Sequence, residues 1–184
     1  MHQVSERMNR VLPSATSAVL NLAAKLKDEG KDIISLGAGE PDFDTPLHIK
    51  EAAIKAIKDG HTKYTAIDGT LTLKKAIINK FIQDNDLIYD YDQIIVSSGA
   101  KQTLFNLCMG LLQHGDEAII PSPYWVSYPD MVRIADATPR FIETSIESSF
   151  KISPKILKDS LNKKTRLIFL NSPSNPTGSC YTKK

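Results

Sequence analysis

Three loops of this chain combine residue types that suit ligand binding. They are Ser97–Gln102, Pro121–Pro129 and Asn171–Gly178, and each directly follows a short apolar run typical of a strand. In open α/β sheets, ligands bind beyond the carboxyl ends of the strands, so a site is expected where such loops meet. The loops differ in the chemistry that they offer.

The first loop, Ser97–Gln102, consists mainly of small residues between a strand and a helix. Small residues let the backbone approach a ligand closely, and the N–H groups at a helix N-terminus attract an anion, for which phosphate is the natural candidate. The alternative is a serine-capped turn that holds no ligand. Because the loop matches neither the dinucleotide-binding nor the P-loop pattern, a nucleotide-binding domain ranks last among the functions considered.

The second and third loops present an aromatic ring and an amide. The only tryptophan, Trp125, stands between Tyr124 and Tyr128, where it could stack on a planar ligand; the alternative is a cluster that packs between domains. Asn175 lies in a proline-rich loop, where its amide could donate to an oxyanion or accept from a hydroxyl. The alternative there is a turn that only reverses the chain. A fourth segment, Gly37–Asp44, has glycines that permit close backbone contact and acidic residues that could simply form turns.

The elements that must position these loops follow from apolar periodicity. Up to about residue 91, helical spacing dominates. Helices are expected after Ala18, from Pro46 with Thr45 as the N-cap, and around Leu73–Phe81, and one strand is expected at 32–36. From residue 92 onward, strands alternate with helices, which indicates an α/β fold with a mainly parallel sheet. The expected strands there are 94–96, 118–120, 140–142 and 166–170, and the expected helices are 104–112, 128–135 and 154–161.

The composition is that of an ordinary soluble globular protein. Of 184 residues, 41% are apolar and 24% are charged, and the formal net charge of +2 gives no basic footprint for nucleic acid. Cys108 and Cys180 have neither a partner spacing nor a nearby histidine, so no metal site is expected and both are predicted to be buried, reduced thiols. The apolar stretch 18–24 is short and interrupted by Asn21, which argues against a signal peptide or membrane span and favours the cytoplasm.

Five motifs together resemble those of the pyridoxal-phosphate-dependent class I aminotransferases. Within that family they are similar to the bacterial aspartate aminotransferases, some of which also accept prephenate. The resemblance extends over essentially the whole chain and implies a fold-type I pyridoxal-phosphate-dependent transferase. The motifs, in the order and spacing of the family, are Gly39–Pro46, Lys63–Tyr64, Lys101–Gln102, Ser122–Pro129 and Asn171–Gly178.

For the cofactor, the resemblance implies that backbone N–H groups of the turn Gly99–Ala100–Lys101 hold the phosphate of pyridoxal 5′-phosphate. It also implies that Trp125 lies beside the pyridoxal ring and that Asn175 binds the phenolic oxygen. Tyr64 would reach the phosphate bound in the partner subunit, which implies a homodimer with shared sites. The family usually has Gly-Gly-Lys in the phosphate turn, and Ala100 departs from it; a methyl group there is a mild change at negative φ and a costly one at positive φ.

For the substrate, the resemblance implies amino transfer between L-aspartate, or a similar amino acid, and 2-oxoglutarate. The backbone of Gly39 would meet the α-carboxylate, with Asn175 and Trp125 also in contact with the substrate. Lys101 is a candidate for pairing with the distal carboxylate of aspartate or glutamate. The preferred amino donor stays open.

Transamination also needs a lysine that forms a Schiff base with the cofactor and a carboxylate that faces the ring nitrogen. In the family these groups lie well downstream of the Asn-Pro-Thr-Gly loop, so no catalytic residue is assigned among residues 1–184. The resemblance then implies an N-terminal arm and small-domain segments over 1–88 and an incomplete large cofactor-binding domain over 89–184. We expect a chain that is inactive alone; the alternative is a truncated, non-catalytic module that pairs with an intact aminotransferase subunit.

Overall fold

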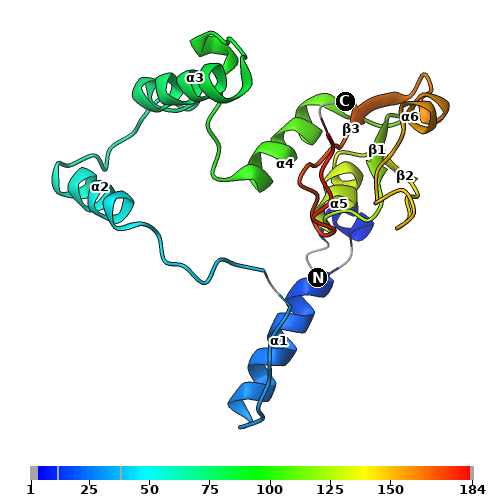
Figure 1. Cartoon of the computed structure of the whole chain (residues 1–184), viewed down its shortest axis with the longest axis horizontal. Helices are drawn as coiled ribbons and strands as arrows, with labels where there is room; N and C mark the ends of the chain where they lie inside the picture. The colour runs from blue at the N-terminus through cyan, green and yellow to red at the C-terminus, as the bar shows by residue number, and fades with distance from the viewer. Residues whose placement is uncertain (1–3, 12, 38, 183–184) are drawn as a thin grey trace. The chain divides into compact units, whose positions relative to one another are not determined.

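The computed structural model of the chain describes residues 4–11, 13–37 and 39–182 (Figure 1). The chain divides into two compact units. Unit 1 consists of Met1–Ser17 with Lys101–Lys184, and unit 2 consists of Ala18–Ala100. The division into 1–88 and 89–184 that the family resemblance implies stays a prediction.

Unit 1 is built on a small parallel sheet. Its strands are β1 (Glu117–Pro121), β2 (Thr138–Ile142) and β3 (Thr165–Ile168), and their order is β2-β1-β3. Parallel strands need crossover connections, which contain α5 (Ser127–Ile134) between β1 and β2, and α6 (Pro154–Ser160) between β2 and β3 (Figure 1). The predicted parallel sheet is therefore confirmed.

The hydrophobic core of unit 1 lies against the central strand, β1. Its residues Ala118, Ile119 and Ile120 are fully buried. Successive strand side chains point to opposite faces, so Ala118 and Ile120 share one face, where they pack with α5 and with α4 (Ala100–Leu111). This packing fixes the carboxyl end of β1, from which the loop with Trp125 departs. The buried cluster comprises Cys108, Leu112, Ala118, Ile120, Tyr128, Met131, Val132, Ala135, Ala137 and Phe169.

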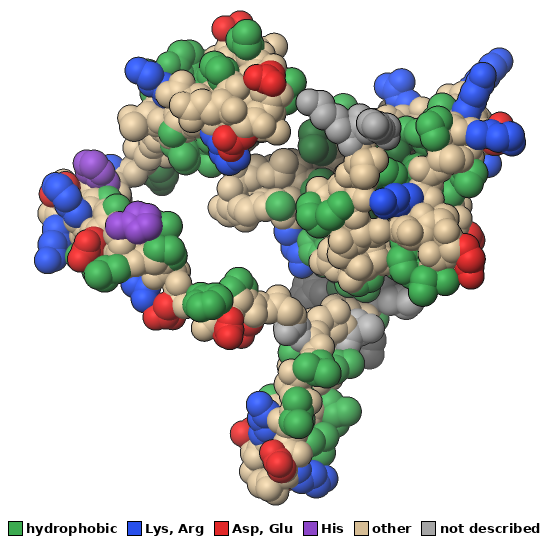
Figure 2. Space-filling model, viewed as in Figure 1, with side chains coloured by type: hydrophobic (Ala, Val, Ile, Leu, Met, Phe, Trp, Pro, Cys, Tyr) green, Lys and Arg blue, Asp and Glu red, His purple; other side chains and the backbone are tan. Residues whose placement is uncertain are grey.

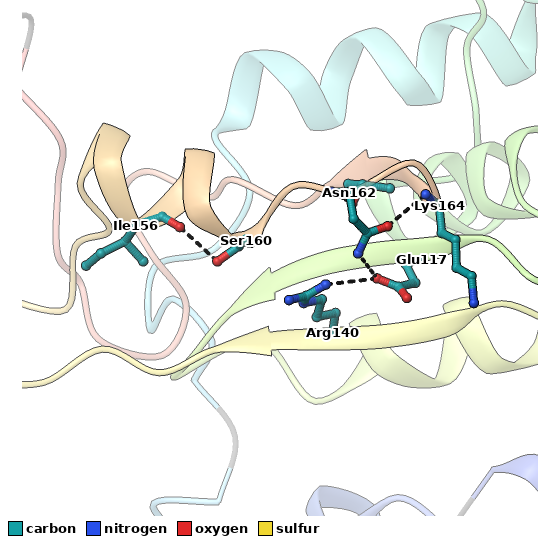
Figure 3. A network of polar contacts seen from close by, with 7 residues as sticks. Glu117, Arg140, Ile156, Ser160, Asn162 and Lys164 are labelled. Carbon is teal, nitrogen blue, oxygen red and sulfur yellow. Dashed lines mark hydrogen bonds and ion pairs between the residues drawn. The ribbon is translucent and has the colours of Figure 1, made fainter.

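Figure 3 shows a polar network at the amino ends of the strands. The Glu117 carboxylate accepts from Asn162 Nδ2 at 2.8 Å and from Arg140 Nη1 at 3.3 Å, and the Glu117 N–H donates to Lys164 O at 2.8 Å. Glu117 belongs to β1, Arg140 to β2, and the other two residues directly precede β3, so one glutamate ties the three strands together. The hydrogen bond from Asn162, together with the charge of Arg140, lowers the pKa of Glu117.

Helix starts follow local signals in the sequence. Ser153 caps α6, with its Oγ accepting a backbone N–H of the first turn at 3.2 Å, and Pro154 is the first helical residue, as predicted. The helix α2 (Leu47–Lys58) begins with Pro46 as its N-cap. The prediction of Thr45 in that position is therefore wrong by one residue.

Unit 2 is mainly helical and sparsely buried. It holds most of α1 (Ala15–Asp28), together with α2, α3 (Leu71–Asn85) and the 3-10 helix η2 (Tyr91–Gln93), whereas the 3-10 helix η1 (Glu6–Arg10) belongs to unit 1. Among the described residues of unit 2, only Lys74 and Ile94 are buried. Hydrophobic side chains consequently reach the surface of its helices (Figure 2).

Two of the predicted strands are wrong. Segments 32–36 and 94–96 have no regular secondary structure in the structure. In the first segment, Ile34 and Leu36 are exposed. In the second, the Val96 N–H donates at 3.0 Å to the carbonyl of Asp68, a loop residue. A β-branched run becomes a strand only where a neighbouring strand pairs with it, and periodicity does not reveal that neighbour.

The prediction that both cysteines are buried is correct for Cys108 and wrong for Cys180, which is exposed. Burial raises the pKa of the Cys108 thiol to about 11.

No helix in the described part of the chain is long and apolar enough to cross a membrane. Within residues 4–11, 13–37 and 39–182, no three His, Cys, Asp or Glu side chains gather in a way that could hold a metal ion.

Candidate functional site

The candidate site lies at the carboxyl edge of the parallel sheet in unit 1. Because β1 and β3 are paired in parallel, the loops that follow them meet at this edge. The loop after β1 carries Tyr124 and Trp125, and the loop after β3 carries Asn175. Tyr124 and Asn175 help to line a cavity of about 30 Å³. A cavity of this size holds about one water molecule, so a larger ligand would bind on the open side of these loops.

Two predicted site residues contact each other. Lys101 Nζ lies 5.0 Å from the centroid of the Trp125 ring. An ammonium group at this distance is attracted by the electron-rich face of the ring. Lys101 stands in the first turn of α4 and Trp125 follows β1, so the packing of α4 on the sheet positions the pair. A cation beside an aromatic face suits a ligand that has a planar ring and negative charge.

Aromatic neighbours hold Trp125 in place. Its ring meets that of Tyr128 edge-on at 5.4 Å, and Tyr128 stacks on Phe169 at 4.6 Å. Phe169 is buried directly after β3, and its N–H donates to Ile119 O at 2.9 Å. Burial raises the pKa of the Tyr128 phenol, which keeps it neutral. These ring contacts all lie within unit 1 and attach the tryptophan to its core.

The loop Asn171–Gly178 is closed by hydrogen bonds of its own. The Asn175 N–H donates to Asn171 Oδ1 at 2.8 Å, and the Gly178 N–H donates to Ser174 O at 2.7 Å. Gly178 has a φ of 70°, a conformation that favours glycine. These bonds fix the loop backbone and hold Asn175 beside the cavity.

The turn before α4 has the geometry that a close backbone approach requires. Gly99 has a φ of 86°, and its N–H donates to Ser97 O at 2.8 Å. A Cβ built on Gly99 would have no atom within 4 Å, so this backbone borders open space. Ala100 is the first residue of α4 and has no positive φ. The departure from Gly-Gly-Lys therefore falls where a methyl group is a mild change.

Gly39 and Tyr64 belong to unit 2. Tyr64 is fully exposed in the loop between α2 and α3. Gly39 is also exposed, and a Cβ built on it would have no atom within 4 Å. In the same segment, Asp44 pairs with Lys50 of α2 at 2.7 Å. The roles assigned to the seven site residues stay predictions: Gly39, Tyr64, Gly99, Ala100, Lys101, Trp125 and Asn175.

Two further residues that line this cavity have no motif in the sequence. Tyr181 Oη accepts from the Ile152 N–H at 2.9 Å, and Ser179 Oγ donates to Ser149 O. Tyr181 and Ser179 line the same cavity as Asn175. The bonded residues are 29 and 30 positions apart in the chain, so no local motif announces them.

A family pattern and the sequences of known proteins both match this chain to aminotransferases. The sequence pattern of the family described as "Aminotransferase class I and II" matches residues 31–184. The chain is 57% identical over 180 residues to the aspartate/prephenate aminotransferase of Nitrosomonas europaea and 55% identical over 181 residues to the probable aspartate/prephenate aminotransferase of Rickettsia felis. Each alignment covers 98% of this chain, but only 45% and 44% of those relatives, so the chain spans less than half of their length.

Solved structures show the same likeness. The aspartate aminotransferase from Rhizobium meliloti matches with a TM-score of 0.94 and 48% identity, over 99% of this chain and 46% of that one. The aspartate aminotransferase from Thermus thermophilus with maleate matches with a TM-score of 0.96 and 44% identity, over 100% of this chain and 48% of that one. These matches confirm the predicted α/β fold, that of the fold-type I transferases, of which this chain carries part.

Proposed function

Because this chain belongs to the aminotransferase class I and II family, we propose that it forms part of the active site of a transaminase. The proposed reaction moves an amino group between L-aspartate, or a similar amino acid, and 2-oxoglutarate. Pyridoxal 5′-phosphate is the proposed cofactor and the cytoplasm the proposed location. The names of the relatives, aspartate/prephenate aminotransferases, support an amino acid and an oxo acid as substrates.

The observation that carries this proposal is the contact between Lys101 and Trp125. Its 5.0 Å separation puts a cation and an aromatic face together at the carboxyl edge of the sheet. Asn175 lies beside the same edge, in the loop that follows β3. This combination suits a ligand that is planar and anionic.

The described residues fit pyridoxal phosphate by their chemistry. The open backbone at Gly99 and the N-terminus of α4 suit a phosphate group. The Trp125 ring suits a planar heterocycle, and the Asn175 amide can donate to its phenolic oxygen. When bound, this cofactor supplies the conjugated ring that withdraws electrons from the α-carbon of the substrate. The protein residues bind it, orient it and exclude water from one face.

Lys101 is the proposed recognition element for the distal carboxylate of the substrate. Its ammonium lies over Trp125, so a carboxylate that pairs with it would also lie near the ring. The relative from Thermus thermophilus was solved with maleate, a dicarboxylate, which supports the same class of substrate here. Gly39 is the proposed contact of the α-carboxylate through its backbone.

Tyr64 is the proposed contact with the phosphate bound in a second subunit, so we propose a homodimer with shared sites. The side chain is fully exposed in the structure. A tyrosine hydroxyl can donate to a phosphate oxygen. This role would leave each site incomplete in a monomer.

The binding test uses Trp125, the only tryptophan of the chain, as its reporter. Pyridoxine 5′-phosphate, which cannot form a Schiff base, is titrated into the protein while tryptophan fluorescence is followed. We expect quenching at concentrations at which pyridoxine, without the phosphate, has no effect. Equal affinity for the two compounds would contradict the proposed phosphate turn at Gly99.

Two lysine variants sharpen this test. Lys101→Met should weaken binding of pyridoxine 5′-phosphate roughly 10-fold, because it removes the positive charge beside the Trp125 ring that attracts an anionic ligand. Lys158→Met removes an exposed lysine of α6 and should leave the affinity unchanged. Equal losses in both variants would indicate a general effect of net charge.

We further propose that the lysine that forms the Schiff base is not among these 184 residues. We expect the chain alone to convert aspartate and 2-oxoglutarate no faster than free pyridoxal phosphate does, and a faster rate would overturn this expectation.

The alternative, a non-catalytic module, predicts that the chain co-purifies with an intact aminotransferase subunit. A pull-down without association counts against that alternative.

A further inference from the structure

Lys74 is the only charged residue that is buried within the described part of the chain. It lies in the second turn of α3, in unit 2, and its side chain is 6% exposed. Its ammonium group forms a hydrogen-bonded ion pair with the carboxylate of Asp68, which stands in the loop before the helix. A buried charge is stable only when it is paired, so this lysine fixes the position of Asp68.

The loop that Lys74 fixes is in close contact with a second segment of unit 2. The Asp68 carbonyl accepts from the Val96 N–H at 3.0 Å. Gly69 has a φ of 107°, and a Cβ built on it would lie 2.5 Å from Val96 Cγ2 and 2.9 Å from Val96 Cβ. No side chain other than hydrogen fits at position 69, because the Val96 side chain packs directly on the backbone of Gly69.

The position of these contacts along the chain connects them to the candidate site. Val96 stands three residues before Gly99, the residue that opens the proposed phosphate turn. Tyr64 stands four residues before Asp68, on the loop that the lysine fixes. The hydrogen bond from Lys74 lowers the pKa of Asp68, which keeps this carboxylate ionised at neutral pH.

We propose that Lys74, Asp68 and Gly69 are positioning residues that hold Val96, and through it the segment 96–100, in the backbone arrangement that binds phosphate. We name these three residues the Lys74 lock. Its link to phosphate rests on the proposed function, whereas its effect on the backbone of 96–100 does not. The lock touches neither substrate nor cofactor and acts only through the segment that follows Val96.

A matched control exists on the same helix. Lys80 pairs with Asp84 at 2.5 Å, also within α3, but both side chains are more than half exposed. An exposed pair of this kind contributes little, because water solvates both charges when it is broken. Lys80→Met therefore removes one lysine and one ion pair from α3 without touching the loop at Asp68.

The experiment measures hydrogen exchange by mass spectrometry in the full 184-residue chain. Lys74→Met should speed exchange in the peptide that covers residues 94–100 by about tenfold or more, with β1 unchanged, while Lys80→Met leaves both at the wild-type rate. Lys74→Arg keeps the charge and should restore slow exchange. In the same samples, Lys74→Met should weaken the binding of pyridoxine 5′-phosphate, and Lys80→Met should not.

Each outcome decides the proposal. Wild-type exchange over 94–100 in Lys74→Met overturns the lock, as does faster exchange that extends equally to β1, since that would be general unfolding. Faster exchange at 94–100 with unchanged affinity overturns the link to the phosphate turn. If the wild-type chain does not bind pyridoxine 5′-phosphate at all, the proposed function fails, while the exchange data still decide whether the lock exists.

Discussion

The two residues that begin the proposed phosphate turn respond differently to a methyl group. Gly99 has a φ of 86°, whereas Ala100 is the first residue of a helix. We expect Gly99→Ala to destabilise the fold by about 1–2 kcal/mol, because an L side chain is disfavoured at positive φ even where no atom clashes with it. Ala100→Gly should cost at most about 1 kcal/mol. Urea unfolding followed by circular dichroism measures both, and equal losses would contradict this backbone assignment.

The two cysteines also differ in their surroundings. Cys108 is buried and its pKa is raised to about 11, whereas Cys180 is exposed. Because the thiolate is the reactive form, we expect Cys180 to react with dithionitrobenzoate in the folded protein while Cys108 stays protected until unfolding. Cys180→Ala should abolish the rapid reaction. A rapid reaction that persists in this variant would show that Cys108 is accessible.

Among the strands, apolar periodicity correctly predicted those that pair with a neighbouring strand in the sheet. The runs 118–120, 140–142 and 166–170 became β1, β2 and β3, because each has a neighbour that supplies hydrogen bonds. The runs 32–36 and 94–96 also contain β-branched residues, but no strand pairs with them in the described part of the chain. Periodicity indicates which side chains prefer burial. Whether a run pairs with another strand depends on the tertiary fold, which periodicity does not indicate.

The sheet itself should be pH-dependent through Glu117. Hydrogen bonding by Asn162 and the charge of Arg140 lower the pKa of this carboxylate. A lowered native pKa means that the ionised group stabilises the fold above its unfolded pKa, and that this contribution is lost as pH falls through the native pKa. Glu117→Gln should therefore be less stable than wild type at pH 7, by about 0.5–1 kcal/mol. The difference should shrink below about pH 4.

Urea unfolding monitored by Trp125 fluorescence, which reports on unit 1, measures this difference at each pH. Glu51→Gln, which changes an exposed glutamate of α2, serves as the control and should leave the stability of unit 1 unchanged. A stability difference for Glu117→Gln that is constant from neutral to acid pH would contradict the role assigned to its charge.

For the molecule as a whole, sequence motifs indicated two residues that the structure brings into contact, but not the contacts that hold the site loops in place. The contact of Lys101 with Trp125 joins two residues that were singled out from adjacent sequence motifs. Neither the burial of Lys74 against Asp68 nor the bond from Ile152 to Tyr181 has such a signal. These supports arise only when segments far apart in the chain, or a helix and its preceding loop, come together, so no local motif indicates them.

The uneven burial of the two units predicts an uneven response to mutation. Ile120 is fully buried in the core of unit 1, whereas Ile57 of α2 is 65% exposed in unit 2. Ile120→Ala should destabilise unit 1 by about 2–5 kcal/mol, because it removes buried methyl groups and leaves a cavity. Ile57→Ala should change stability by less than about 0.5 kcal/mol, since the side chain has little contact to lose. Urea unfolding, followed by Trp125 fluorescence for unit 1 and by circular dichroism for the helices, measures each change. A loss for Ile57→Ala as large as that for Ile120→Ala would mean that α2 is buried in solution, by a second copy of the chain or by another partner.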